Sequence, residues 1–295
     1  MTRPTLARID RAALRHNLAI ARRAARGAAV MAVVKADGYG HGIAAAAGAL
    51  RDADAFGVAT LEEALAVRTV APERPIVLLE GFYSPTELGA IIRHRLDIVV
   101  HREDQVAALE QLDAERPLTV WLKIDSGMHR LGFTAEETPD IRRRLGACRA
   151  VAQPVRLMTH LACADTPGHP ANGMQMERFA AATAGLEGPV SIANSAALVS
   201  LHTARRDWVR PGIMLYGASP LADVPASRLD LRPAMTLESA LIAVKPCAAG
   251  ERVGYGATWT IVTTHELTQG LPPTWTDPDE GLSIVDPAPG AIVLV

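Results

Sequence analysis

The stretch VVKADGYGHG at residues 33–42 decides the fold. An apolar, valine-rich run at residues 29–34 ends in Lys35, a glycine-rich turn follows, and an alanine-rich segment begins at Ile43. This order predicts a strand, a loop and a helix, with one amine at the tip of a buried strand. Burial disfavours the charged form of an amine, and a neutral amine can bond to a carbonyl carbon as a Schiff base. Most strand-end lysines reach solvent instead, so position alone leaves both interpretations open.

The composition bounds the class of protein. The chain has 295 residues, 49% of them hydrophobic, and a formal net charge of −2. It can therefore form one large domain, or a large domain and a smaller one. Arginines scattered among acids argue against nucleic acid or an anionic membrane as partners. Three widely spaced cysteines predict neither a disulfide framework nor a metal site. Without an apolar N-terminal signal, we expect a soluble cytoplasmic protein.

Apolar runs alternate with helical patterns along most of the chain. Predicted strands cover residues 29–34, 55–59, 76–79, 97–100, 118–124, 155–160, 190–192 and 208–209. Predicted helices cover residues 43–50, 61–70, 85–94, 103–112, 135–148, 174–186 and 195–202, after a first helix that begins at Asp10 and ends near residue 26. This repeat has the number of units that a (β/α)8 barrel needs. A doubly wound sheet would show fewer units and a dinucleotide fingerprint, which is absent because position 43 is Ile.

The pattern changes near residue 232. Extended segments at residues 235–244 and 253–256 predict the opening of a β domain. Prolines then accumulate without periodicity, which predicts an irregular tail from about residue 261. We therefore predict the α/β class, with a (β/α)8 TIM barrel over residues 1–232 and an incomplete C-terminal β domain over residues 233–295.

Polar side chains follow several predicted strands. They comprise Lys35, residues 123–132, His160, Asn194 with Ser195, and residues 210–213. Chemistry in such barrels lies at the carboxyl ends of the strands, and the turns after the last two strands often hold phosphate. Taken singly, Ser195 predicts a helix N-cap, Arg130 a solvated side chain and His160 a hydrogen-bonded core histidine. Their convergence on one face of the barrel predicts a site instead.

Residues 32–42, AVVKADGYGHG, resemble the lysine motif of the alanine racemase family, which uses pyridoxal phosphate (PLP). The resemblance continues in order through residues 123–132, 159–160, 193–196, 209–217 and 254–259, and it covers about residues 4–260. It implies an isomerase that interconverts L-alanine and D-alanine and supplies D-alanine for peptidoglycan. It also implies a homodimer with a small amino acid as substrate and no metal.

The resemblance implies a role for each matching residue. Lys35 binds PLP and acts as one catalytic base, and Tyr255, from the other subunit, acts as the second. Arg210 meets the pyridine nitrogen, Arg130 and Met128 bind the substrate, and Lys123 is the candidate for a carbamylated lysine that pairs with Arg130. The cofactor-binding residues implied are Lys35, Tyr39, His160, Asn194, Ser195, Arg210, Gly212 and Ile213.

The resemblance ends near residue 260. The further β-domain segments of the family do not occur in residues 261–295, so we interpret the C-terminal domain as truncated or frame-shifted and expect weakened racemase activity. Four alternatives remain open. They are a non-catalytic PLP-binding barrel, a racemase of another amino acid, a barrel decarboxylase, which would place an acid where Arg210 stands, and a Schiff-base aldolase that uses Lys35 without a cofactor.

Overall fold

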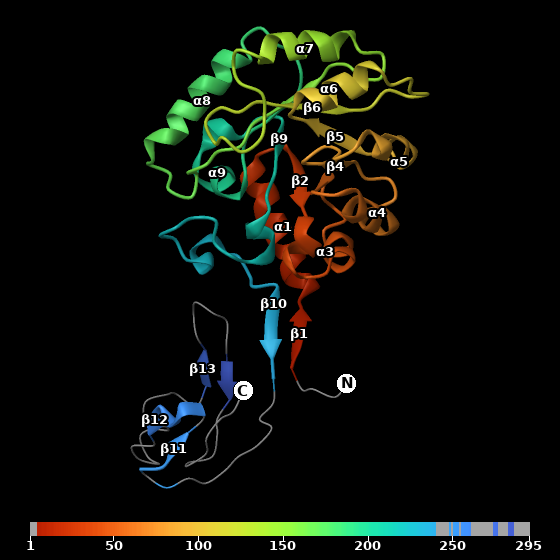
Figure 1. The fold of residues 1–295 in the computed structure, drawn as a ribbon. Coiled ribbons are helices and arrows are strands. Elements are labelled where there is room, and N and C mark those ends of the chain that lie inside the picture. The colour runs from red at the N-terminus through yellow and green to blue at the C-terminus, as the bar shows by residue number, and fades with distance from the viewer. Residues whose placement is uncertain are drawn as a thin grey trace. The chain divides into compact units, whose positions relative to one another are not determined.

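The structure is a computed structural model, and it describes residues 5–239, 248, 250–253, 255–260, 274–276 and 283–285. The chain divides into two compact units (Figure 1). Asp10–Ala234 form the larger unit, and Met1–Ile9 with Met235–Val295 form the smaller one. The sequence pattern assigned the first nine residues to the barrel, whereas the observed division groups them with the C-terminal segment.

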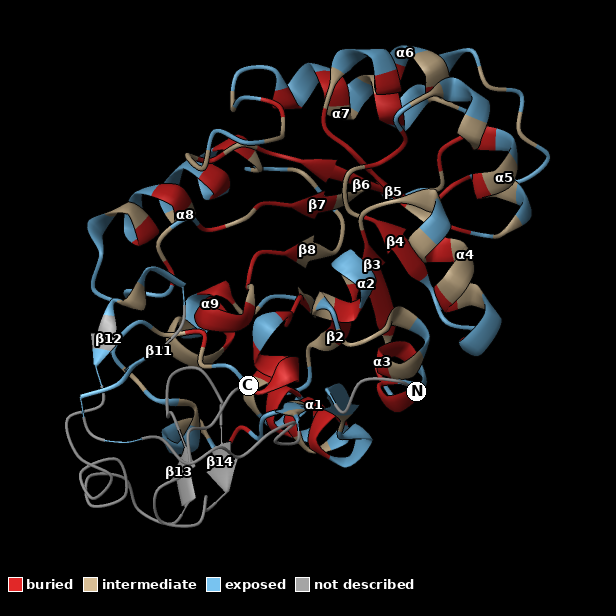
Figure 2. Ribbon diagram, turned by 60° about the horizontal axis from the view of Figure 1, so that its bottom comes forward, coloured by how far each residue is buried: buried red, intermediate tan, exposed pale blue. Residues whose placement is uncertain are grey.

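The larger unit is a closed barrel of eight parallel strands, which confirms the predicted (β/α)8 fold. The strands are β2 (Ala29–Val33), β3 (Ala55–Val58), β4 (Ile76–Leu78), β5 (Asp97–Val100), β6 (Val120–Lys123), β7 (Arg156–Met158), β8 (Val190–Ser191) and β9 (Trp208–Val209). The barrel closes where β2 pairs with β9, with Val30 opposite Val209. The strands are buried almost throughout (Figure 2), which is why they read as continuous apolar runs in the sequence.

Helices cover the outside of the barrel (Figure 2). They are α1 (Arg11–Ala25), α3 (Ile43–Ala49), α4 (Leu61–Val70), α5 (Leu88–Arg93), α6 (Glu103–Glu110), α7 (Thr138–Ala147), α8 (Pro170–Ala182) and α9 (Ser195–Ser200). The short segment α2 (Lys35–Tyr39) lies instead at the carboxyl end of β2, inside the ring of helices (Figure 2). Short 3-10 turns are η1 (Pro85–Glu87), η2 (His202–Ala204), η3 (Ile213–Tyr216) and η4 (Ala226–Leu229). Asp10 caps α1 as predicted, because its carboxylate accepts the amide protons of Ala12 and Ala13 at 2.7 and 3.0 Å.

Local capping explains where helices differ from prediction. The helix predicted at residues 174–186 begins at Pro170, because the His169 ring accepts the Ala171 amide and proline suits the first helical position. The helix predicted at residues 85–94 splits into η1 and α5. Ser84 and Glu87 form a capping box there, which favours a tight first turn.

An ionic and aromatic cluster lies at the amino ends of the strands. Asp97, Arg156 and Trp208 are the first residues of β5, β7 and β9. The Arg156 guanidinium lies 3.6 Å from the Asp97 carboxylate and 5.2 and 5.6 Å from the ring centres of Trp121 and Trp208. Burial raises the pKa of Asp97 to about 6, although Arg156 partly offsets this effect. Apolar side chains around Met31 and Trp121 fill the adjoining interior.

The smaller unit contains antiparallel strand pairs. Strand β1 (Leu6–Ile9), which the sequence pattern did not predict, pairs with β10 (Met235–Glu238). The other pairs are β11 (Arg252–Val253) with β12 (Trp259–Thr260) and β13 (Thr274–Thr276) with β14 (Ser283–Val285).

Two predictions in this unit need correction. The tail predicted to be irregular contains β13 and β14, whose register places Trp275 opposite Ile284. The strand predicted at residues 253–256 is partly the 3-10 turn η5 (Tyr255–Ala257), in which Gly256 takes a positive φ of 72°. Residues 240–244 of the predicted extended segment lie outside the described residues. Within the described chain, no helix combines the length and apolar content needed to cross a bilayer.

Candidate functional site

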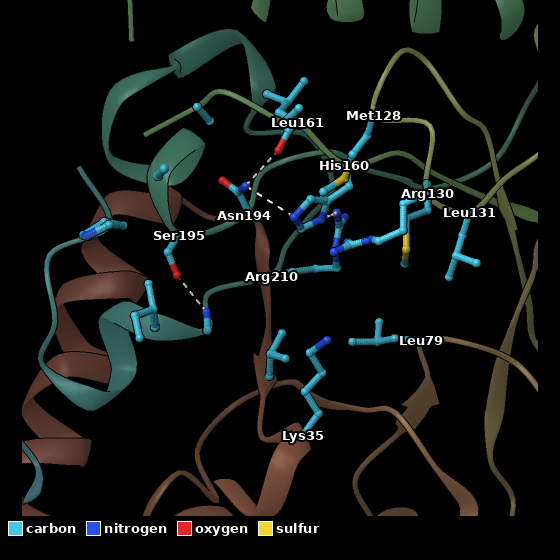
Figure 3. Close-up of a pocket in the computed structure, with 18 of the residues that line it drawn as sticks. Lys35, Leu79, Met128, Arg130, Leu131, His160, Leu161, Asn194, Ser195 and Arg210 are labelled. Carbon is cyan, nitrogen blue, oxygen red and sulfur yellow. Dashed lines mark hydrogen bonds between the residues drawn. The ribbon is translucent and has the colours of Figure 1, made fainter. Parts of the chain in front are cut away.

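A cavity of about 590 Å³ lies at the carboxyl ends of the barrel strands (Figure 3). The predicted site residues that line it are Lys35, Tyr39, Lys123, Met128, Arg130, His160, Asn194, Ser195, Arg210, Gly212 and Ile213. The carboxyl ends of parallel strands converge, so residues far apart in the sequence meet here. The predicted residue Tyr255 belongs to the smaller unit, where its side chain is fully exposed.

Lys35 begins a left-handed turn and does not extend β2, which ends at Val33. The next residues, Ala36, Asp37, Gly38 and Tyr39, have φ values of 53°, 53°, 63° and 54°. L-residues rarely take this conformation in succession. The turn directs the half-buried Lys35 side chain into the cavity, toward the side where Arg210 lies (Figure 3).

Arg210 follows β9 and is buried beneath the cavity. One terminal nitrogen donates to Ser191 Oγ at 2.6 Å, and the other donates to the carbonyl oxygens of Thr159 and Ile192. Burial lowers the pKa of Arg210 to about 10, which leaves the guanidinium cationic at neutral pH. Burial and the charge of Arg210 hold the pKa of His160 well below its usual value, so the ring is neutral. Its Nδ1 can therefore accept from Arg210 at 3.2 Å.

Lys123 is the last residue of β6 and only 8% exposed. Burial lowers its pKa to about 8, and the positive charges of Arg210 and Arg130 act in the same direction. About a tenth of this amine is therefore unprotonated at pH 7, far more than for a lysine with its usual pKa. An unprotonated amine can react as a nucleophile, which a solvated lysine does far less readily.

The loop at residues 125–132 carries Met128 and Arg130 to the cavity. Asp125 shapes it, because one carboxylate oxygen accepts the amide protons of Gly127, Met128 and His129 at 2.9, 3.1 and 3.0 Å. The loop closes where the amide of Asp125 donates to the carbonyl oxygen of Phe133 at 2.8 Å. The arrangement places the Arg130 side chain at the cavity wall, near His160 and Arg210 (Figure 3).

Ser195 and Gly212 form the opposite wall. The Ser195 hydroxyl accepts the Gly212 amide proton at 2.8 Å, which joins the start of α9 to the turn after β9 (Figure 3). A side chain at residue 212 would collide with the Tyr39 hydroxyl. Tyr39 stacks on Tyr216 with ring centres 4.7 Å apart. Asn194 caps α9 by accepting the Ala197 amide at 3.0 Å. The wall thus presents the Ser195 hydroxyl, with the Tyr39 hydroxyl lying against the backbone of Gly212.

Two acidic residues that the sequence pattern did not predict, Glu80 and Asp165, also line the cavity. Glu80 comes two residues after β4, so the rule that chemistry follows strand ends could have identified it. The Tyr83 hydroxyl donates to Glu80 at 2.5 Å, and this hydrogen bond to the carboxylate raises the pKa of Tyr83 to about 12. Asp165 lies in the loop between β7 and α8 and had no such signal.

Taken together, the cavity combines the Lys35 amine, three further side chains that are mostly cationic, and a wall that presents hydroxyl groups. Lys35 can bond to a carbonyl carbon, and the charges of Lys123, Arg130 and Arg210 favour an anionic ligand. Neutral His160 can pack against a ring without adding charge. This set suits a small anionic aldehyde and a second anionic molecule beside it. Among the described residues, no cluster of acids, cysteines and histidines could hold a metal ion.

Comparisons with known proteins agree with this description. Residues 9–220 match the family model described as alanine racemase, N-terminal domain. The alanine racemase of Shewanella sp. (strain W3-18-1) is 49% identical over 254 residues, which are 86% of this chain and 71% of that protein. The alanine racemase of Vibrio parahaemolyticus is 49% identical over 252 residues, 85% of this chain and 70% of that protein.

Solved structures of alanine racemases resemble the chain as well. The biosynthetic alanine racemase from Pseudomonas aeruginosa is similar with a TM-score of 0.84 and 42% identity, over 93% of this chain and 80% of that one. The alanine racemase from Acinetobacter baumannii is similar with a TM-score of 0.80 and 36% identity, over 89% and 74% of the two chains.

Proposed function

The chain belongs to the alanine racemase family, and we propose that it interconverts L-alanine and D-alanine with pyridoxal phosphate as its cofactor. The observation that carries this proposal is that the Lys35 amine and the buried, cationic Arg210 line the same cavity as the wall at Ser195 and Gly212.

The residues fit the cofactor. The Ser195 hydroxyl, which accepts the Gly212 amide proton, and the Tyr39 hydroxyl, which lies where a Cβ at residue 212 would stand, can both bond to a phosphate group. The Lys35 amine can bond to the aldehyde carbon, and the Arg210 guanidinium can donate to the pyridine nitrogen. When bound, the cofactor supplies a conjugated ring that takes up the charge left when the substrate Cα loses its proton.

Lys35 and Tyr255 are proposed to move the proton. Racemisation requires that a proton leave one face of Cα and return to the other. Lys35 lies at the cavity and serves one face. Tyr255 is proposed to serve the other face from a partner subunit, so the active form is proposed to be a homodimer.

Arg210 sets the protonation of the ring. A guanidinium keeps its protons at neutral pH. It would therefore donate a hydrogen bond to the ring nitrogen without transferring a proton, as a carboxylic acid could, and the nitrogen would stay unprotonated. In the described structure its hydrogen-bond partners are hydroxyl, carbonyl and imidazole groups. This environment argues against the barrel decarboxylase, which needs an acid at this position.

Arg130 and Lys123 are proposed to act as a pair. The Arg130 guanidinium can orient the substrate carboxylate through charge-assisted hydrogen bonds. The lowered pKa of Lys123 suits reaction of its neutral amine with carbon dioxide, in which a nitrogen–carbon bond forms and one proton leaves to solvent. The resulting carbamate is an anion that can pair with Arg130. Lys123 is thus the proposed site of carbamylation.

The proposal is tested with the purified chain and pyridoxal phosphate. L-Alanine should yield D-alanine, detected with a D-amino-acid oxidase, and borohydride should trap the cofactor on Lys35, located by mass spectrometry. Lys35→Ala should lose both signals. A trapped adduct without D-alanine would point to a binding protein, and D-serine formed faster than D-alanine would point to a racemase of another amino acid. A fully active chain would contradict the expectation of weakened activity.

A further inference from the structure

The left-handed turn after Lys35 is anchored by a side chain from another element. Glu63, the third residue of α4, reaches back to the barrel. One of its carboxylate oxygens accepts the Ala36 amide proton at 2.7 Å, and the other accepts the Ala59 amide proton at 2.8 Å. A single carboxylate therefore ties the residue after Lys35 to the segment that follows β3.

The turn has strong internal bonds but needs a fixed position. Within it, the Gly40 amide donates to the Ala36 carbonyl oxygen at 3.0 Å, and the Ile43 amide donates to the Asp37 carboxylate at 2.8 Å. These bonds maintain the shape of the turn, but they connect it only to itself and to the start of α3, the segment that directly follows. The bond from Ala36 to Glu63 lies directly beside Lys35, and Ala36 takes a φ that is unfavourable for a residue with a Cβ. Strained backbone persists where the surroundings hold it.

We propose that Glu63 is a positioning residue for Lys35: its carboxylate holds the strained turn so that the Lys35 amine points into the cavity. This inference rests on the proposed function of Lys35. Both oxygens of Glu63 accept from backbone amides, so glutamine cannot replace it. The amide group of glutamine would turn a donor toward one of the two N–H groups, which cannot form a hydrogen bond.

The test compares Glu63→Gln with Glu62→Gln. Glu62 is the neighbouring residue on α4 and is exposed, and its side chain makes no hydrogen bond in the described structure, so it is a matched control. Hydrogen–deuterium exchange of residues 35–42 is measured first, in the chain without cofactor. Glu63→Gln should raise the exchange rate of this segment about tenfold, as expected for a lost hydrogen bond to a charged group. Glu62→Gln should leave it unchanged.

The second readout is the rate at which Lys35 forms a borohydride-trappable adduct with pyridoxal phosphate. Glu63→Gln should slow this rate about tenfold and lower kcat more than it changes KM for alanine. A purely structural role would lower the unfolding temperature and leave the adduct rate of the folded protein intact. If Glu63→Gln does not fold, Glu63→Ala replaces it, because the exposed Ala36 amide can then bond to water.

The outcomes separate the two proposals. If the unmodified chain forms no adduct, the proposed function of Lys35 fails, and the exchange comparison still decides whether Glu63 holds the turn. If the unmodified chain forms the adduct and the Glu63 variant matches the Glu62 variant in both readouts, the role of Glu63 is overturned.

Discussion

At the scale of single residues, the charge of Arg210 adds to the effect of burial on the protonation of its neighbours. The guanidinium is fully enclosed yet keeps its proton, because its terminal nitrogens donate to Ser191, Thr159 and Ile192. Its field adds to the effect of burial in lowering the pKa of both His160 and Lys123. Burial and one permanent cation together keep the His160 imidazole neutral and make the Lys123 amine easier to deprotonate.

Replacement of Arg210 by glutamate should change the outcome of the reaction. A carboxylate can share a proton with the pyridine nitrogen, and a protonated ring withdraws more charge from the substrate. The charge then persists longer, so reprotonation at the wrong carbon becomes more frequent. For Arg210→Glu we expect the ratio of pyruvate to D-alanine to rise about tenfold or more. A factor of ten is the free-energy equivalent of a shift of one pKa unit.

The measurement is pyruvate by lactate dehydrogenase and D-alanine by chromatography in one reaction. Arg228→Glu, at an exposed position on η4, is the control for the added acid. An unchanged ratio in a folded Arg210→Glu variant would show that residue 210 does not contact the ring nitrogen.

At the scale of elements, the loop at residues 125–132 links a buried strand to the cavity. Asp125 accepts three consecutive amide protons, and Gly132 has a φ of 126° where a Cβ would lie only 2.7 Å from the Asp125 nitrogen. The Ser126 hydroxyl is 2.8 Å from that of Thr159, which joins the loop to the end of β7. The loop is therefore held at its base and along its length, and this fixes where Arg130 emerges.

Removal of the Asp125 carboxylate should act through Arg130. Asp125→Ala leaves three amide groups without their acceptor, so we expect KM for alanine to rise about tenfold with a smaller change in kcat. In a chain that already carries Arg130→Ala, the same change should add less than about twofold, because residues that act as one unit give non-additive effects. Steady-state kinetics of the unmodified chain, the two single variants and the double variant complete this double-mutant cycle.

Asp10→Ala serves as the control, because Asp10 also accepts backbone amides but lies outside the cavity. It should lower the unfolding temperature and leave KM unchanged. Fully additive effects of Asp125→Ala and Arg130→Ala on KM would contradict the link.

At the scale of the barrel unit, stability depends on charge buried at the amino ends of the strands. Asp97, Arg156, Trp121 and Trp208 come from four different strands and meet in one cluster. The pKa of Asp97 is raised from 3.8 to about 6, chiefly by burial. The folded protein therefore holds a proton on Asp97 that the unfolded chain releases between these two values, so this group makes the barrel less stable as pH rises through the window.

Replacement of Asp97 by asparagine should remove this dependence. Relative to the unmodified chain, Asp97→Asn should gain up to about 3 kcal/mol in free energy of unfolding between pH 4 and pH 7, the amount that corresponds to the raised pKa. Urea unfolding at both pH values measures it. Asp113→Asn, at an exposed position, is the control, and its free energy of unfolding should change with pH as that of the unmodified chain does. If the free energies of unfolding of Asp97→Asn and of the unmodified chain changed with pH in the same way, Asp97 would ionise normally in the folded protein.

The sequence by itself determined the barrel and most of the polar residues that line its cavity. Fully buried parallel strands must be apolar on both faces, so β2 to β9 appear as short apolar runs separated by helical patterns. Because parallel strands share one carboxyl end, polar residues such as Lys35, His160 and Arg210 could be assigned to one site before any coordinates existed.

Only the tertiary structure decided features that depend on distant partners. Strand β1 exists because Leu6 pairs with Glu238, a contact that four residues of local sequence cannot encode. Ala36 takes a left-handed conformation against its own preference, because Glu63 of another helix holds it. The neutral state of His160 likewise depends on burial and on a guanidinium from a different strand. In each case the deciding energy comes from groups that are remote in the chain and adjacent only after folding.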